Sequence, residues 1–349
     1  MPTTISRQPD FAQFLKALWR RGRPDHLPFY EHLASAGFIA RRTGTDFDRM
    51  GYDDPRYWPT YVGFWLGMGY DCIPMEIGLS CRLASSDHEA GAMSHRSEAT
   101  ACIFSLADFE QYPWPPVSDP IDFRHFETVA KLLPDGAKIV GGVGAGPYEW
   151  ATYFMGVEGL ALAIYDQPEL VAAVFSKLRE LHGSAHRQLA EMDCIGALRQ
   201  GDDLGFKTAT FLQPDHLRQY VFPIYADLAA AAHAHNKPFI LHSCGDLDAV
   251  YDDLIACGVD AKHSFEETIR PVEDFKAEYG ARCTPLGGLD VDMVCRADEP
   301  TLRAYTRDKI EKCFADGWWA LGTGNSLTDY MPVEQYLIVL DEGMKVAGK

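Results

Sequence analysis

The chain has 349 residues, 47% of them hydrophobic and 23% charged, a composition that suits one large α/β barrel or two globular domains. Its 32 basic and 50 acidic residues give a net charge of -18, which argues against DNA or RNA as a partner because phosphate binding needs a basic face. No apolar run predicts a membrane helix or a signal peptide, so we expect a cytoplasmic protein with reduced cysteines.

Short apolar runs recur along the chain and predict eight strands, at residues 27–33, 72–77, 138–143, 194–198, 238–241, 259–263, 283–286 and 318–321. Helical patterns lie between the later runs, at residues 168–191, 214–235, 301–314 and 332–346. Strands that alternate with helices pair in parallel. The expected fold class is therefore α/β, as a single (β/α)8 TIM barrel that occupies residues 1–349 as one domain.

One region departs from the repeated unit. Residues 80–120 show no clean helical pattern and contain the proline-rich run Tyr112-Pro113-Trp114-Pro115-Pro116. The segment is too short for a second domain, so we expect a hairpin-like excursion from the barrel. It also offers a surface for a homodimer contact.

Reactive side chains follow two of the expected strands. The fifth strand ends in His242-Ser243-Cys244-Gly245, and the fourth ends near Asp202 and Asp203. In parallel α/β proteins this edge of the sheet carries the chemistry. An imidazole and a thiolate two residues apart can bind one zinc ion, so His242 and Cys244 are candidate metal ligands. The alternative is that both only line a pocket.

Asp202 and Asp203, together with His242, are the candidate catalytic residues. The two carboxylates could act as an acid–base pair or hold a substrate. Adjacent residues of an extended chain point opposite ways, so we expect only one of them to face the site. The alternative role is to cap the following turn. His263, at the end of the sixth strand, is either a core histidine or a further ligand.

Five motifs, in this order and spacing, resemble the uroporphyrinogen decarboxylase superfamily: Phe109-Glu110-Gln111-Tyr112-Pro113-Trp114-Pro115, Gly201-Asp202-Asp203-Leu204-Gly205, His242-Ser243-Cys244-Gly245, Gly287-Gly288-Leu289-Asp290 and Asp329-Tyr330-Met331-Pro332. The resemblance extends from the opening helix to the end of the chain. It implies a (β/α)8 barrel with its site at the C-terminal face, in agreement with the strand count.

The superfamily contains metal-independent decarboxylases and zinc- and corrinoid-dependent methyltransferases. The decarboxylases share an early arginine-rich motif, roughly Arg-Gln-Ala-Gly-Arg, whose arginines bind the carboxylates of the porphyrinogen. This chain lacks the motif and has Tyr30, Glu31 and His32 near the first strand end, where Glu31 would repel an octa-acid. The chain is thus closer to the methyltransferase branch.

The methyltransferases resemble one another in His-x-Cys followed by a later cysteine. His242 and Cys244 match the first half, but Asn325 stands where the second cysteine is expected. Catalytic zinc commonly takes three protein ligands, so either a carboxylate supplies the third or the zinc affinity is lower. The candidates are Asp202, Asp203, Glu266 and Glu267, with Glu76 and Glu149 as more remote options.

The leading hypothesis is a zinc-assisted methyltransferase or demethylase that acts on a small molecule. Its corrinoid would sit on a separate partner protein, because the corrinoid-binding loop Asp-x-His-x-x-Gly is absent here. The alternatives are a metal-independent decarboxylase or lyase on a small or tetrapyrrolic acid, and a non-catalytic barrel that binds a corrinoid or tetrapyrrole. The candidate substrate-binding residues are Glu76, Tyr148, Glu149, Glu266, Asn325 and Tyr330.

Overall fold

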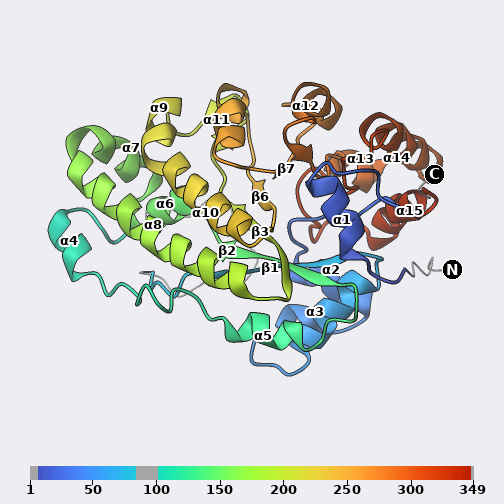
Figure 1. Cartoon of the computed structure of the whole chain (residues 1–349), viewed down its shortest axis with the longest axis horizontal. Helices are drawn as coiled ribbons and strands as arrows, with labels where there is room; N and C mark the ends of the chain where they lie inside the picture. Colours follow the sequence, from blue (N-terminus) through green and yellow to red (C-terminus); the bar gives the residue numbers. More distant parts are fainter. Residues whose placement is uncertain (1–6, 84–100, 347–349) are drawn as a thin grey trace.

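The strands form one parallel sheet in chain order. The computed structural model describes residues 7–83 and 101–346 (Figure 1). The six hydrogen-bonded strands of this sheet all run parallel, and each lies beside its neighbour in the sequence. They are β1 (Cys72–Gly78), β2 (Lys138–Gly144), β3 (Ile195–Gly201), β6 (Phe239–His242), β7 (Ala261–His263) and β8 (Thr284–Pro285). This arrangement confirms six of the eight expected strands.

The remaining two expected strands are bridged segments rather than regular strands. Leu286 pairs with Ala320, and Phe29 pairs with Leu321, so the first segment lies beside the last. Pro28 has no N–H to extend a ladder, which is one reason why the pairing stays at single bridges. Within the described residues, no bridge joins the 29–34 segment to β1. With these two segments the wall has eight parallel members, and the (β/α)8 barrel is confirmed.

An apolar layer fills the N-terminal half of the barrel, and each of the eight parallel segments contributes one residue to it. The contributors are fully buried and form one cluster: Tyr30, Cys72, Val140, Ala197, Ile240, Ala261, Leu286 and Ala320. Phe14 of α1 (Phe11–Leu18) belongs to the same cluster, and its ring stacks on that of Tyr30 with centroids 5.8 Å apart. Helix α1 therefore closes the N-terminal end, and only the C-terminal end is left for a site.

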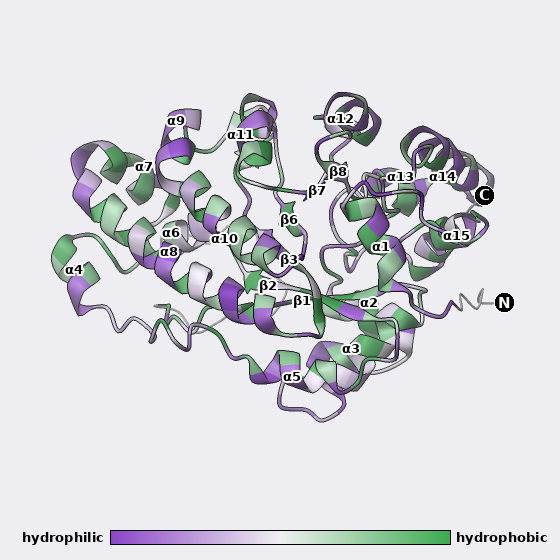
Figure 2. Ribbon diagram, viewed as in Figure 1, coloured by the Kyte–Doolittle hydropathy of each residue, from purple (hydrophilic) through white to green (hydrophobic). Residues whose placement is uncertain are grey.

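Helices pack around the strands in Figure 1. In α8 (Pro168–Glu191), whose bounds match the expected ones, Leu170, Val174, Leu178 and Leu181 are all buried, and hydrophilic and hydrophobic residues alternate along it in Figure 2. The others are α2 (Ala36–Thr43), η1 (Phe47–Arg49), α3 (Tyr57–Leu66), α4 (Leu106–Gln111), α5 (Arg124–Ala130), α6 (Pro147–Met155), α7 (Val157–Asp166), α9 (Pro214–His216), η3 (Leu217–Val221), α10 (Phe222–Ala234), η4 (Asp248–Val250), α11 (Tyr251–Ala256), α12 (Val272–Tyr279), α13 (Val291–Arg296), α14 (Glu299–Cys313) and α15 (Val333–Met344).

Two helical regions differ from expectation. The single helix expected at 214–235 is interrupted by the π-helical turn η3. In the excursion, α4 forms where no helix was expected, because Ser105 accepts a hydrogen bond from the N–H of Asp108 and caps its start. Residues 84–100, where much of the expected hairpin falls, lie outside the described part of the chain. The ends of the excursion meet where Ser80 N–H donates to the carbonyl of Pro120 at 2.8 Å.

A small hairpin that the sequence did not predict follows β3. Its strands are β4 (Gly205–Phe206) and β5 (Ala209–Thr210), which pair antiparallel. The loop after β6 packs directly on it: a Cβ at Gly245 would lie 2.1 Å from the backbone carbon of Gly205, and Gly245 has a φ of +86°. Only glycine permits both the approach and this backbone conformation. The contact brings the loop after β3 against the loop after β6.

Candidate functional site

A polar layer lies directly above the apolar layer in the barrel. It comprises His32, Arg199, His242 and His263, each two positions after a member of the apolar layer and each buried. Alternate residues of a strand face the same side, which explains this spacing. His32 and Arg199 were not expected at the site, although the same two-residue spacing within their strands could have indicated both.

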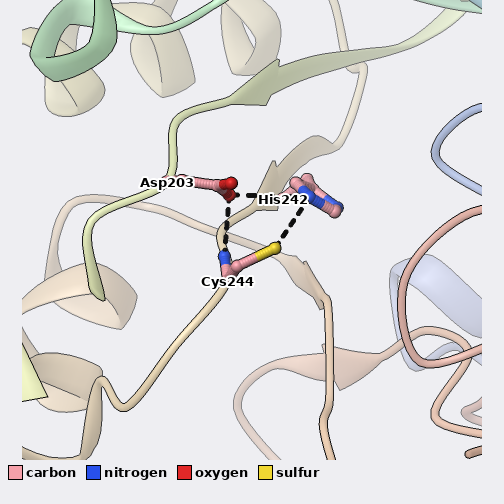
Figure 3. A group of neighbouring side chains, drawn as sticks. All are labelled: Asp203, His242 and Cys244. Atoms are coloured by element: carbon pink, nitrogen blue, oxygen red, sulfur yellow. Dashed lines mark hydrogen bonds and ion pairs between the residues drawn. The ribbon is translucent and has the colours of Figure 1, made fainter. Parts of the chain in front are cut away.

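His242, Cys244 and Asp203 gather at the C-terminal end of this layer (Figure 3). The Nε2 atom of His242 lies 3.5 Å from Cys244 Sγ and 3.7 Å from Asp203 Oδ1. All three potential ligand atoms lie within 4.8 Å of one another. Ligand atoms of a tetrahedral zinc are roughly 3.4–3.7 Å apart, given the usual zinc–ligand bond lengths. The two distances from His242 Nε2 fall in this range, so the three residues have the donor atoms and the proximity that one zinc ion needs.

The hydrogen bonds around His263 determine where His242 carries its proton. His263 Nε2 lies 3.1 Å from the carbonyl oxygen of Thr323, which can only accept, so His263 Nε2 is protonated. Burial lowers the pKa of His263 to about 3, and the ring is neutral. Its Nδ1 must then accept from His242 Nδ1, 2.7 Å away. The lone pair of His242 therefore lies on Nε2, which faces Cys244 and Asp203.

Three groups hold the Cys244 side of the cluster. The amide of Asn325 donates to Cys244 Sγ at 3.4 Å, and the hydroxyl of Ser264 donates to it at 3.5 Å. The backbone N–H of Cys244 donates to Asp203 Oδ1 at 2.9 Å. Burial raises the pKa of the thiol, so a bound cation would be needed to stabilise the thiolate. Asn325, expected as a substrate-binding residue, thus lies against the cysteine itself.

Asp202 and Asp203 point to different places. The Asp202 carboxylate is fully buried and accepts from the N–H groups of Tyr148 and Glu149 and from the hydroxyl of Tyr225, at 3.0, 2.9 and 2.7 Å. It holds the first turn of α6 to the barrel. Burial raises the pKa of Asp202 to about 7. Asp203, which is one-third exposed, is the member of the pair that lies beside His242.

The other carboxylates proposed as ligands lie elsewhere. Glu266 is exposed, and Glu267 accepts from the Tyr305 hydroxyl and from Lys309 at 2.7 and 2.6 Å. Glu76 pairs with Arg199 Nη2 at 3.0 Å inside the barrel. Glu149 accepts from the N–H of Gly146 at the start of α6. Asp203 is therefore the carboxylate that the fold brings to His242 and Cys244.

Acidic groups nonetheless surround this end of the barrel. Burial raises the pKa of Glu149 well above its ordinary value, and the charges of Asp202 and Asp203 raise it further. Burial also raises the pKa of Glu76; Arg199 opposes this effect, and Asp203 adds to it. These couplings place the carboxyl groups within electrostatic reach of one another.

The two tyrosines expected at the substrate site differ in their surroundings. Tyr148 is buried at the start of α6, and its ring stacks on that of Phe211 with centroids 5.9 Å apart. Phe211 is 43% exposed, so this aromatic pair reaches the surface next to the β4–β5 hairpin. Tyr330 is 71% exposed and lies on the surface. The substrate-binding roles of both tyrosines stay predictions.

Glu31 does not face a substrate, contrary to the sequence argument. It is fully buried and accepts from the N–H and hydroxyl of Thr323 and from the hydroxyl of Tyr336. Burial raises the pKa of Glu31 to about 8. When Glu31 is protonated on Oε2, this bond reverses and the O–H donates to the Thr323 hydroxyl, while Oε1 still accepts from the backbone N–H. The carboxyl is thus a neutral structural group.

This burial predicts a pH-dependent stability. The folded pKa of Glu31 lies above the unfolded value, so its contribution is complete below about pH 4.3 and is lost as the pH rises towards 8. Glu31→Gln has the same shape and can repeat the same hydrogen bonds. We expect urea denaturation to show a smaller loss of stability between about pH 5 and pH 8 in the variant than in the wild type. Parallel pH curves would contradict this assignment.

The chain is a (β/α)8 barrel with three possible metal-ligand atoms at its C-terminal end. The family model for uroporphyrinogen decarboxylase (URO-D) matches residues 92–342, and the chain is a member of this family. Among solved structures, a methyltransferase from Methanosarcina mazei is similar to this chain with a TM-score of 0.70 and 15% identity, covering 96% of this chain and 98% of that chain. This likeness supports the barrel fold.

A search of curated proteins finds no match to the chain. Within residues 7–83 and 101–346, no helix is both long enough and apolar enough to cross a membrane.

Proposed function

We propose that the chain is a zinc-assisted methyltransferase or demethylase that acts on a small molecule and exchanges the methyl group with a corrinoid on a separate protein. The observation that carries this proposal is the cluster of His242, Cys244 and Asp203, which offers one nitrogen, one sulfur and one oxygen ligand. Three protein ligands leave the fourth position of a tetrahedral zinc to a substrate. The fold likeness to a methyltransferase is consistent with it.

Bound zinc would lower the pKa of a substrate thiol, or polarise an ether oxygen, at that open position. The residues of the chain prepare the site for this role. His263 keeps the Nε2 lone pair of His242 directed at the cluster. Asn325 and Ser264 donate to Cys244 Sγ and so favour its thiolate form. Asp203 supplies the carboxylate that replaces the second cysteine of related methyltransferases.

The alternatives are supported less well by the same geometry. A decarboxylase of tetrapyrrolic acids needs cationic groups for the substrate carboxylates. Arg199 is fully buried and paired with Glu76, and further acidic side chains lie nearby. Asp202, the other candidate catalytic carboxylate, is engaged in holding α6. A barrel that only binds a corrinoid would not need three converging metal ligands.

The proposal is tested by zinc content and methyl transfer. We expect the purified protein to hold about one zinc per chain, in line with one set of three ligands. Methylcobalamin and 2-mercaptoethanol serve as probes: the thiolate attacks the methyl carbon, and the cobalt–carbon bond breaks with its electron pair left on cobalt. The product cob(I)alamin should form only with zinc-loaded protein, as seen by visible absorbance under anaerobic conditions. A protein that refuses added zinc would refute the proposal.

A further inference from the structure

His32 carries a buried nitrogen that has no hydrogen-bond partner. Its side chain is 1% exposed, and its ring stacks on that of the candidate ligand His242 with centroids 3.8 Å apart and planes 15° apart. Among the described residues, no group forms a hydrogen bond with His32 Nε2. A buried polar atom without a partner costs free energy unless a water or a ligand satisfies it. The ring that carries this atom therefore lies directly on the ring of a proposed zinc ligand.

The neighbours of His32 show that this nitrogen is a donor. Its Nδ1 lies 3.4 Å from Nη1 of Arg199, and a guanidinium can only donate. Nδ1 must therefore accept. The imidazole ring therefore carries no proton on Nδ1. Its single proton is then on Nε2, the atom without a partner.

The carboxylate of Glu76 faces His32 Nε2 without forming a direct hydrogen bond to it. Glu76 Oε2 lies 3.6 Å from His32 Nε2, too far for a direct hydrogen bond, and an oxygen placed beside the line that joins these two atoms could bond to both. Gly201 borders the gap: a Cβ there would come within 3.0 Å of His32 Nε2 and 4.0 Å of Glu76 Oε2. A larger residue at 201 would crowd this space, so glycine keeps it open.

The charges around the gap limit the group that can occupy it. Glu76 Oε2 pairs with Arg199 Nη2 at 3.0 Å and faces His32 Nε2, so an oxygen that bonds to both side chains has to accept from His32 and donate to Glu76. A carboxylate or phosphate oxygen has no proton to donate and would meet the Glu76 carboxylate. A hydroxyl can accept from His32 Nε2–H and donate to the Glu76 carboxylate at the same time.

We propose that His32 and Glu76 form a subsite for a hydroxyl oxygen of the substrate, beside the point at which the substrate meets the metal. This subsite rests on the proposed function, because the metal anchors the rest of the molecule. It assigns the substrate to the uncharged, hydroxyl-bearing small molecules. Anionic substrates, including porphyrinogen acids, do not belong to this class.

Two small thiols that differ only in a hydroxyl test this assignment. Isothermal titration of the zinc-loaded protein would compare 2-mercaptoethanol with ethanethiol. We expect 2-mercaptoethanol to bind about five- to tenfold more tightly, as one neutral hydrogen bond typically provides. Mercaptoacetate, which replaces the hydroxyl with a carboxylate, should bind no better than ethanethiol.

A matched pair of variants ties the preference to His32. Phenylalanine at 32 can still stack on His242 but has no N–H, so His32→Phe should keep zinc and ethanethiol binding and lose the preference for the hydroxyl. His32→Gln can place an amide N–H near the same point and should keep much of it. Thermal denaturation of each variant confirms that it is folded.

The outcomes separate the subsite from the proposed function. Equal binding of both thiols by zinc-loaded wild type overturns the subsite alone, because it shows that only a water occupies the gap. A preference that survives in His32→Phe overturns it as well, since the hydroxyl then binds elsewhere. Zinc-loaded protein that binds neither thiol has no open metal position, which overturns the proposed function and the subsite together.

Discussion

Replacing Asp203 with alanine is expected to lower the zinc affinity by at least about a hundredfold, because it removes one of three ligands; loss of a supporting residue alone can cost tenfold to a hundredfold. The carboxylate lies 3.7 Å from His242 Nε2 and is one-third exposed, so the fold should tolerate the change. Competition with a chromophoric chelator measures the affinity.

The adjacent carboxylate supplies the control. Asp202 accepts three hydrogen bonds in a fully buried position, and each of its oxygens faces one backbone N–H, so the amide NH2 of Asp202→Asn meets a donor in either orientation. We expect Asp202→Asn to keep zinc but to lose about 2–4 kcal/mol of stability in urea denaturation. The reverse pattern, with zinc lost in Asp202→Asn and kept in Asp203→Ala, would exclude the ligand assignment.

A large effect is also expected at His263, which does not touch the proposed metal. His263→Leu removes the acceptor for His242 Nδ1–H, so that His242 can shift its proton to Nε2 and block the ligand atom. We expect zinc affinity to fall about 10- to 100-fold, the usual cost of losing a residue that orients a metal-binding histidine. His263→Gln is the matched variant, because its amide can accept from His242 and donate to the Thr323 carbonyl.

A second measurement tests this arrangement without metal. Nitrogen-15 NMR of the histidine rings distinguishes a proton on Nδ1 from a proton on Nε2. His242 should carry its proton on Nδ1 in the wild type and in His263→Gln, and on Nε2 in His263→Leu. If His242 is already protonated on Nε2 in the metal-free wild type, the relay from Thr323 through His263 is wrong.

The barrel was predictable because its signals are local. Each apolar run is bounded by glycine, proline or polar residues, and alternation with helices restricts the strands to parallel pairing. The strand ends were predictable for the same reason, so the positions of His242 and Cys244 at the C-terminal edge followed from the sequence. The capped start of α4 and the β4–β5 hairpin were missed because short elements leave little periodicity to detect.

The third proposed ligand could not be selected from the sequence. Asp202, Asp203, Glu266 and Glu267 all follow strands and have the same chemistry. Their roles differ because their partners differ. Asp202 accepts from a backbone N–H at the start of α6, Glu267 pairs with Lys309, and Asp203 accepts from the N–H of Cys244 in the loop after β6. Each of these partners belongs to a different unit of the barrel.

The sequence by itself determined the barrel, its C-terminal edge and the pair His242 and Cys244, because strands, their ends and a two-residue spacing depend on near neighbours in the chain. Only the tertiary structure decided that Asp203 completes the cluster, that His263 orients His242 and that His32 faces Glu76. These contacts join residues from different strands, and their distances depend on how the loops pack, as the close approach of Gly205 and Gly245 shows.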